Sequence, residues 1–395
     1  MLKTMPRKLI AGLILYGSAF LAIAGVPPHV NWAPCGEGRF CATVPVPRDY
    51  AKPKGPQLEL AVVKLPAARP EQRIGSLFIN FGGPGAPAVE TLKRIGKTEF
   101  ARLNERFDLI GFDPRGVGES RPAIDCQAHE GKQAPFLTPL NIDRHSWMVD
   151  AKAVATACLR ANPGILGYVT TANVARDLDR LRAAVGDERL SYLGFSYGTY
   201  LGATYASLFP GRYRAMVLDG ALAATTYARH PIATGMAQMS GFEQALDRFL
   251  SACAADQVAC AGFGGDDPGM AFDWLVAQAN RLPVPAHGDN PAPVDGDDLL
   301  MATSQALYTK QTWPLLARAL ATASRGDGTL ARELADIAYG RNPDGTYDPM
   351  LDRYFAITAV DERWPRQTRV YERAGHEAWS SFRRFWWGVG YSNLQ

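Results

Sequence analysis

Short apolar runs and stretches of helical spacing alternate along the first half of the chain. From Gln57 to Leu65 apolar and polar residues alternate, which is typical of a half-buried strand. Apolar runs that stop at turn residues predict further strands at Ser76–Phe81, Phe107–Phe112, Leu190–Leu193 and Tyr213–Leu218. Helical spacing between them predicts helices at Ala88 to about Asn104, Asn173–Val185 and Tyr197–Phe209. This order predicts an α/β fold with a doubly wound, mostly parallel sheet.

The pattern changes after Gly220, at the end of the strand that reaches Asp219. Helical spacing without a convincing parallel strand follows, at Gly241–Ala255, Met270–Arg281, Asp297–Tyr308 and Pro314–Ser324. We interpret residues 221–355 as a helical cap inserted into an α/β core whose N-terminal part spans residues 25–220. Residues 356–395 are then a return segment toward the core. Within the core, residues 26–56 are rich in proline and are interpreted as a lead-in, with one strand-like stretch at Phe40–Val46.

The N-terminus has the features of an export signal. Lys3, Arg7 and Lys8 precede an apolar run from Leu9 to Ala24, which ends in small residues suited to cleavage. We therefore predict a signal peptide over residues 1–24 and a secreted or cell-envelope protein. The alternative, an uncleaved anchor, needs a span of roughly 20 apolar residues. The run falls short of that length, so no stable membrane span is expected after cleavage.

Six cysteines in an exported chain form an even set that oxidation can pair. Six cysteines allow 15 pairings. Proximity in the sequence favours Cys35 with Cys41, Cys126 with Cys158, and Cys253 with Cys260. Because the chain has no C-x-x-C motif or His/Cys cluster, we expect neither a metal site nor a cofactor. The formal net charge is +3, without a basic run, so nucleic acid is not an expected partner.

A G-x-S-x-G motif stands between a predicted strand and a predicted helix. Gly194-Phe195-Ser196-Tyr197-Gly198 follows Leu190–Leu193 and is followed by a helix rich in small residues. This is the context of a nucleophile elbow, in which a strained turn exposes a serine at the N-terminus of a helix. The alternative is an ordinary turn that contains a serine. We interpret Ser196 as a catalytic nucleophile.

A second glycine-rich turn, Gly82-Gly83-Pro84-Gly85, follows the strand that ends at Phe81. Acyl transfer needs two backbone N–H donors for the developing oxyanion, one after the serine and one in a turn such as this. We assign the oxyanion hole to Gly83 and Tyr197. The turn could instead cradle a phosphate, but the Lys-Ser/Thr pair of a phosphate loop is absent.

Longer stretches around these motifs resemble the exported tripeptidyl aminopeptidases of actinobacteria, in the proline iminopeptidase branch of the α/β-hydrolases. The similar stretches are C-A-T-V-P-V-P-R-D-Y, G-F-D-P-R-G-V-G-E-S, G-F-S-Y-G-T-Y-L-G-A-T-Y-A-S-L-F-P, M-V-L-D-G and F-A-I-T-A-V-D-E-R-W-P-R, between Cys35 and Tyr391. The resemblance implies a serine peptidase that releases short peptides from free N-termini, with the cap over its substrate. Many relatives have histidine in place of Phe81, and several have cysteine in place of Ala359.

The partners that would activate the serine do not stand out in the sequence. In this fold the order is Ser, Asp, His, with the last two on loops after late strands. Asp219 at a strand end is our candidate acid and His376 our candidate base, each with the alternative of a purely structural role. The expected late strands are missing, so we expect a shortened form of a longer hydrolase. Its strand Tyr213–Leu218 would be an unpaired sheet edge, with apolar surface open near Phe382, Phe385, Trp386 and Trp387.

The sequence thus favours an exported serine aminopeptidase acting on a peptide, with two alternatives: a non-catalytic homologue and a carboxylesterase acting on small esters. An aminopeptidase needs an anion for the ammonium group of its substrate. Glu119, Glu243 and Asp247 are candidates by charge alone.

Overall fold

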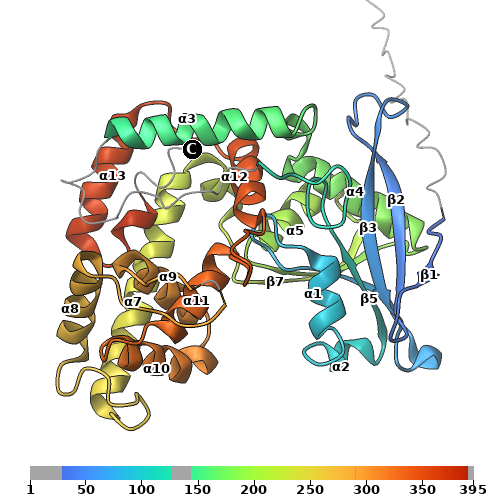
Figure 1. The fold of residues 1–395 in the computed structure, drawn as a ribbon. Helices are drawn as coiled ribbons and strands as arrows, with labels where there is room; N and C mark the ends of the chain where they lie inside the picture. Colours follow the sequence, from blue (N-terminus) through green and yellow to red (C-terminus); the bar gives the residue numbers. More distant parts are fainter. Residues whose placement is uncertain (1–28, 127–143, 290, 390–395) are drawn as a thin grey trace, which may run out of the picture.

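A computed structural model describes residues 29–126, 144–289 and 291–389 (Figure 1). The predicted signal peptide, residues 1–24, lies outside this described part. In the described part a mixed sheet and its covering helices form one half of the molecule, and a group of helices forms the other (Figure 1).

The sheet has seven strands in the order β1-β2-β3-β5-β4-β6-β7. Strands β4, β5, β6 and β7 are mutually parallel, whereas β1, β2 and β3 join the β5 edge in antiparallel fashion. The predicted doubly wound, mostly parallel sheet is therefore confirmed. The strand bounds are Ala33–Pro34 (β1), Phe40–Pro47 (β2), Gln57–Leu65 (β3), Gly75–Asn80 (β4), Phe107–Phe112 (β5), Leu190–Phe195 (β6) and Tyr213–Asp219 (β7).

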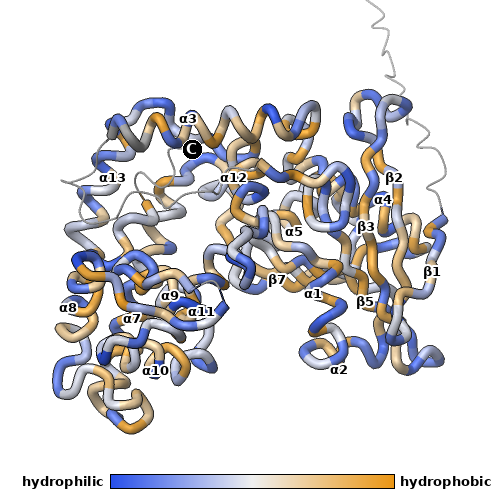
Figure 2. The backbone as a smooth tube through the Cα atoms, in the orientation of Figure 1, coloured by the Kyte–Doolittle hydropathy of each residue, from blue (hydrophilic) through white to orange (hydrophobic). Residues whose placement is uncertain are grey.

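The proline-rich segment before residue 57 is an integral part of this sheet, not a lead-in to it. Strand β2 pairs with β3 along its whole length, from Phe40 opposite Lys64 to Pro47 opposite Gln57. Val44 and Val46 on β2 are buried in the same apolar cluster as Leu58 and Leu60 on β3. Proline is compatible with this position because β2 lies near the sheet edge. In Figure 2 the apolar colour follows the strands, whereas the β2–β3 turn is polar.

Helices cover the sheet in the order expected from the sequence, with one break. The predicted helix from Ala88 to Asn104 is two helices, because the first ends at Gly96, a poor helix former. The helices of this half are α1 (Ala88–Ile95), α2 (Ala101–Asn104), α4 (Thr171–Ala184) and α5 (Tyr197–Leu208), with short 3₁₀ turns at Pro70–Gln72 (η1) and Leu166–Tyr168 (η2). Helix α3 (Arg144–Ala161) runs instead along the helical half, toward α13 (Thr368–Ser381) (Figure 1). Helices α4 and α5 pack against each other.

The helical insertion after β7 has an apolar core of its own. That core joins buried residues of α7, α8, α9, α10 and α11, among them Phe249, Phe272 and Leu316. The helices are α6 (Ala224–Arg229), α7 (Pro231–Ala255), α8 (Pro268–Arg281), α9 (Gly296–Leu307), α10 (Trp313–Ala323), α11 (Thr329–Tyr339), α12 (Met350–Asp361) and α13 (Thr368–Ser381), with η3 at Lys310–Thr312 and η4 at Trp386–Gly388.

The last helices differ from the expected return toward the core. Helix α12 does contact the sheet half, but α13 and η4 pack against α7 in the cap. Three of the four aromatic side chains expected to lie open beside the sheet are buried there instead: Phe382, Phe385 and Trp386 are at most 5% exposed, and Trp387 is partly buried. Within the described residues β7 is an outer strand, and its Val217 is 59% exposed.

The three predicted disulfides are present, and they join Cys35 to Cys41, Cys126 to Cys158, and Cys253 to Cys260. Within the residues that the structure describes, no helix combines the length and apolar character needed to cross a membrane.

Candidate active site

Ser196 occupies a strained turn between β6 and α5. Its φ of 52° and ψ of −120° are unusual for a residue that carries a side chain. Three hydrogen bonds hold this conformation: the Ser196 N–H donates to the carbonyl of Asp219 (2.9 Å), and both the N–H (2.8 Å) and the hydroxyl (2.6 Å) of Thr199 donate to the carbonyl of Ser196. Local strain of this kind is typical of a nucleophile elbow.

The two glycines of the motif are required by close packing on either side of the serine. A Cβ at position 194 would lie 2.5 Å from the carbonyl oxygen of Gly198. A Cβ at position 198 would lie 2.7 Å from Oδ1 of Asn80, at the end of β4. Side chains at these positions would therefore push the elbow away from the sheet.

The glycine-rich turn after β4 lies directly against the elbow. A Cβ at Gly82 would be 2.6 Å from the Phe195 carbonyl oxygen and 3.3 Å from the Tyr197 nitrogen. The Asn80 side chain fixes the turn by accepting a hydrogen bond from the Gly82 N–H (3.0 Å). Gly82, next to the predicted donor Gly83, is thus the residue of this turn that touches the elbow.

Substituting Gly82 by alanine tests whether this contact matters for reactivity. Since φ is +86° at Gly82, the new Cβ would add backbone strain to a clash with Phe195. We expect the rate of labelling by a fluorophosphonate probe to fall by on the order of 10²-fold, the usual effect of losing one oxyanion donor. Gly211→Ala is the matched control, because Gly211 has a similar φ of +81° with open space around it. Equal labelling of the two variants would contradict this role for the turn.

Helix α12 lies against the far side of the same turn. A Cβ at Gly85 would lie 2.9 Å from Cβ of Arg353 and 3.2 Å from the nitrogen of Tyr354. On the sheet side, the Phe81 ring stacks on Phe195 at a centroid distance of 6.2 Å. The turn is therefore held between the elbow and α12.

The two candidate partners of the serine differ in where the structure places them. Asp219 is an exposed residue whose carbonyl is bonded to the Ser196 N–H, so it lies beside the elbow. His376 is exposed on α13, which packs against α7 on the side of the cap far from α5 (Figure 1). The structure therefore does not bring His376 to Ser196. Among the described residues, no histidine forms a hydrogen bond with the serine.

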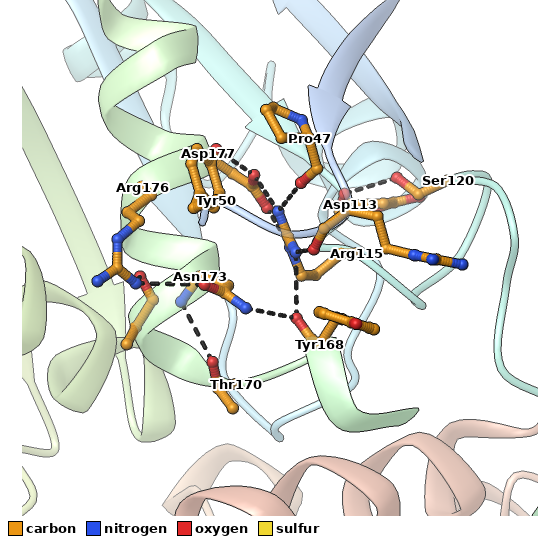
Figure 3. A network of polar contacts seen from close by, with 12 residues as sticks. Pro47, Tyr50, Asp113, Arg115, Ser120, Tyr168, Thr170, Asn173, Arg176 and Asp177 are labelled. Atoms are coloured by element: carbon orange, nitrogen blue, oxygen red, sulfur yellow. Dashed lines mark hydrogen bonds and ion pairs between the residues drawn. The ribbon is translucent and has the colours of Figure 1, made fainter. Parts of the chain in front are cut away.

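The G-F-D-P-R-G motif after β5 serves to build the core. Arg115 and Asp177 form a fully buried ion pair, with Nε to Oδ2 at 2.7 Å and Nη2 to Oδ1 at 2.6 Å (Figure 3). The same guanidinium donates to the carbonyls of Pro47, Arg48 and Tyr168, and the Tyr50 hydroxyl donates to Asp177. This network fastens β2, the loop after β5 and α4 together behind the elbow.

Two neighbouring acids at the end of α12, Asp361 and Glu362, have raised pKa values. Burial raises the pKa of Asp361 to about 6, although hydrogen bonds from the Thr171 hydroxyl (2.5 Å) and N–H (2.8 Å) partly offset it. Burial also raises the pKa of Glu362 to about 7, an effect that hydrogen bonding with Tyr227 partly offsets and the charge of Asp361 slightly increases. The F-A-I-T-A-V-D-E-R-W-P-R stretch contains both acids, but its sequence pattern does not indicate their burial.

A Glu362→Gln variant should reveal how much the ionised Glu362 carboxylate lowers the free energy of unfolding. The folded protein holds the Glu362 proton up to about pH 7 and the unfolded chain releases it near 4.5, so stability falls as pH rises through that window. At pH 8 we expect the variant to be more stable than the wild type by about 1–2 kcal/mol, allowing for partial exposure, and near pH 4.5 nearly equal to it. Denaturant unfolding at both pH values, with the exposed Glu333→Gln as control, measures this difference. A destabilised variant at pH 8 would be inconsistent with the shift.

The acids singled out by charge alone are all engaged in ion pairs. Glu119 pairs with Lys93 (3.0 Å), and both Glu243 and Asp247 pair with Arg384 (3.5 Å and 3.1 Å). Arg384 is shared with a third acid, Asp273 (2.7 Å), so these contacts hold helices α7 and α8 to the segment after α13. No cluster of three or more metal-binding side chains occurs in the part of the chain that is described.

A cavity of about 250 Å³ lies between α3 and α12, beside the Cys126–Cys158 disulfide. Its walls are mainly apolar and include Leu159, Val360 and Trp364, and Ser196 is not among the residues that line it.

Comparisons with known proteins agree with this architecture. The family described as "alpha/beta hydrolase fold" matches residues 82–259. Serine protease Hip1 of Mycobacterium tuberculosis is 36% identical over 375 residues, which cover 88% of this chain and 70% of the relative. Tripeptidyl aminopeptidase of Streptomyces lividans is 30% identical over 90% of this chain and 68% of its own. Carboxylesterase B of M. tuberculosis is 36% identical over 86% of this chain and 67% of its own.

The fold, the strained elbow and these relatives define an enzyme of the serine hydrolase class. The chain belongs to the α/β-hydrolase family, together with the serine protease, aminopeptidase and carboxylesterase named above.

Proposed function

We propose that the protein is an exported aminopeptidase that releases short peptides from free N-termini through an acyl-enzyme on Ser196. The observation that carries the catalytic part is the elbow itself, where Ser196 has a φ of 52° at the N-terminus of α5. The Ser196 hydroxyl attacks the scissile carbonyl, and the backbone N–H groups of Gly83 and Tyr197 stabilise the oxyanion. Contact between the Gly82 turn and the Tyr197 nitrogen supports that assignment.

Turnover also needs a base that accepts the serine proton and returns it to the leaving amine. Asp219 is our proposal for the acid that would orient such a base, because its backbone already adjoins Ser196. His376 does not fit the role of this base, because α13 packs against α7, away from α5.

Export and the preference for peptides are supported by separate observations. Three disulfides within the described residues suit an oxidising compartment outside the cytoplasm, as does the predicted signal peptide. The name of the Streptomyces relative supports aminopeptidase activity, whereas that of the M. tuberculosis carboxylesterase supports a second candidate, hydrolysis of small esters.

Matched substrates distinguish these activities. We expect a tripeptide p-nitroanilide with a free N-terminus to be cleaved at least about tenfold faster, in kcat/KM, than its N-acetylated form. Equal cleavage of the two forms would contradict an aminopeptidase. Cleavage of p-nitrophenyl butyrate with neither peptide cleaved would favour the esterase.

A further inference from the structure

Asp361 and Glu362, the adjacent acids at the end of α12, lie close to the elbow through a short series of contacts. The N–H of Arg363 donates to the carbonyl of Ala228 on α6 (2.9 Å). The loop that leads into α6 is in turn fixed to the elbow helix, because the Leu222 N–H donates to the Thr199 hydroxyl (2.9 Å). The acids are thus held where the cap rejoins the core, beside the helix that Ser196 begins.

Their negative charge is not compensated by a basic side chain of the described residues. Neither acid forms an ion pair there, and no arginine or lysine contributes to the pKa of either one. The two acids nevertheless differ. Asp361 accepts hydrogen bonds from the hydroxyl and the N–H of Thr171 at the start of α4, which gives it a structural role, whereas the hydrogen-bond partner of Glu362 is the Tyr227 hydroxyl.

Three tyrosines lie within electrostatic range of Glu362. Its charge acts on Tyr200 of α5, Tyr227 of α6 and Tyr354 of α12, which together with Asp361 are the titratable groups that face it. The Tyr200 and Tyr227 rings are 4.8 Å apart, and Tyr227 lies 6.3 Å from the ring of Tyr197, the residue after the nucleophile. The rings of Tyr200 and Tyr227 are therefore packed next to the elbow.

Tyr227 brings a buried hydroxyl to Glu362. Only 7% of the residue is exposed, and hydrogen bonding between its hydroxyl and the Glu362 carboxylate contributes to the pKa of both groups. After burial itself, the charge of Glu362 is the largest cause that raises the pKa of Tyr227, which places the two side chains together.

We infer that Glu362, flanked by Asp361 and by the rings of Tyr200 and Tyr227, is the binding site for a primary ammonium group, namely the free N-terminus of the substrate. An ammonium group supplies the positive charge that the carboxylates lack and three N–H donors that can reach Glu362 and the Tyr227 oxygen. Tyrosine faces also attract such a cation. The inference rests on the proposed aminopeptidase function and names the residues that would make it specific for free N-termini.

Binding measured without turnover tests this site separately from catalysis. In a Ser196→Ala background, isothermal titration at pH 7.5 would compare tri-alanine amide with its N-acetylated form, neither of which has a charged side chain. We expect the free peptide to bind at least tenfold more tightly. Glu362→Gln should remove that preference and leave the N-acetyl peptide unchanged, whereas the control Glu333→Gln, an exposed cap acid, should keep it.

A pH series adds a second readout on the same proteins. Affinity for the free peptide should fall at least severalfold between pH 7.5 and pH 5.5 as Glu362 becomes protonated, and the fall should vanish in Glu362→Gln. Equal binding of free and acetylated peptides, an unchanged preference in Glu362→Gln, or no binding of either peptide at millimolar concentration would overturn the inference. The free peptide could also bind more tightly than the acetylated one while Ser196 of the wild-type chain is unreactive. That result would refute the proposed catalysis but support the ammonium site.

Discussion

Ser196→Ala is expected to lower kcat/KM for any substrate of this protein by on the order of 10⁶-fold, as removal of a catalytic serine does in other serine hydrolases. The hydroxyl is the attacking group, and a methyl group at this position can form no acyl-enzyme. Steady-state hydrolysis of the tripeptide p-nitroanilide measures the effect. Because alanine at this φ is no more strained than serine, the variant should remain folded.

The matched control for this variant is Ser207→Ala. Ser207 is exposed on the same helix, α5, and we expect its replacement to change kcat/KM by less than about twofold. Full activity in Ser196→Ala would show that the elbow is only a turn, the alternative that the sequence left open.

Arg115→Ala is expected to lower the free energy of unfolding by about 3–5 kcal/mol, because it leaves the Asp177 carboxylate buried without a partner. Both side chains of the pair are 0% exposed, and the guanidinium also holds the carbonyls of Pro47, Arg48 and Tyr168. Urea denaturation followed by circular dichroism measures the loss.

Arg176→Ala is the control, since Arg176 also lies over the Tyr50 ring but forms hydrogen bonds only within its own helix, α4 (Figure 3). We expect it to cost less than about 1 kcal/mol. Joint replacement of Arg115 by Met and Asp177 by Leu should be milder than Arg115→Ala, because no charge is left buried. A loss below about 1 kcal/mol in Arg115→Ala would refute the role given to the network.

Local sequence was sufficient to predict the elbow and the disulfides. The strand, the strained turn and the small-residue helix around Ser196 are consecutive in the chain, so a short stretch of sequence is enough to recognise the motif. Two of the disulfides close loops of only six and seven residues, so proximity in sequence was a sound guide to their pairing. The helices after β7 were predicted for a similar reason, because they have regular apolar spacing.

Features that depend on distant packing were missed. The proline-rich segment before residue 57 belongs to the sheet because β2 pairs with β3. The spacing of its apolar residues did not indicate that pairing. The position of α13 depends on its contacts with α7, about 130 residues earlier, so the sequence order alone placed His376 wrongly near the core. The environment of Glu362 combines residues of α5, α6 and α12, and only the folded chain shows that its charge has no basic partner among the described residues.

The central claim is that Ser196 is an activated nucleophile held by the folded elbow. The most direct measurement is the reaction of the native protein with a fluorophosphonate probe, followed by mass spectrometry of its proteolytic peptides. The account predicts a single adduct on the peptide that contains Ser196 and no adduct after prior unfolding in urea. A native protein that stays unlabelled, or one labelled on another residue, would contradict it.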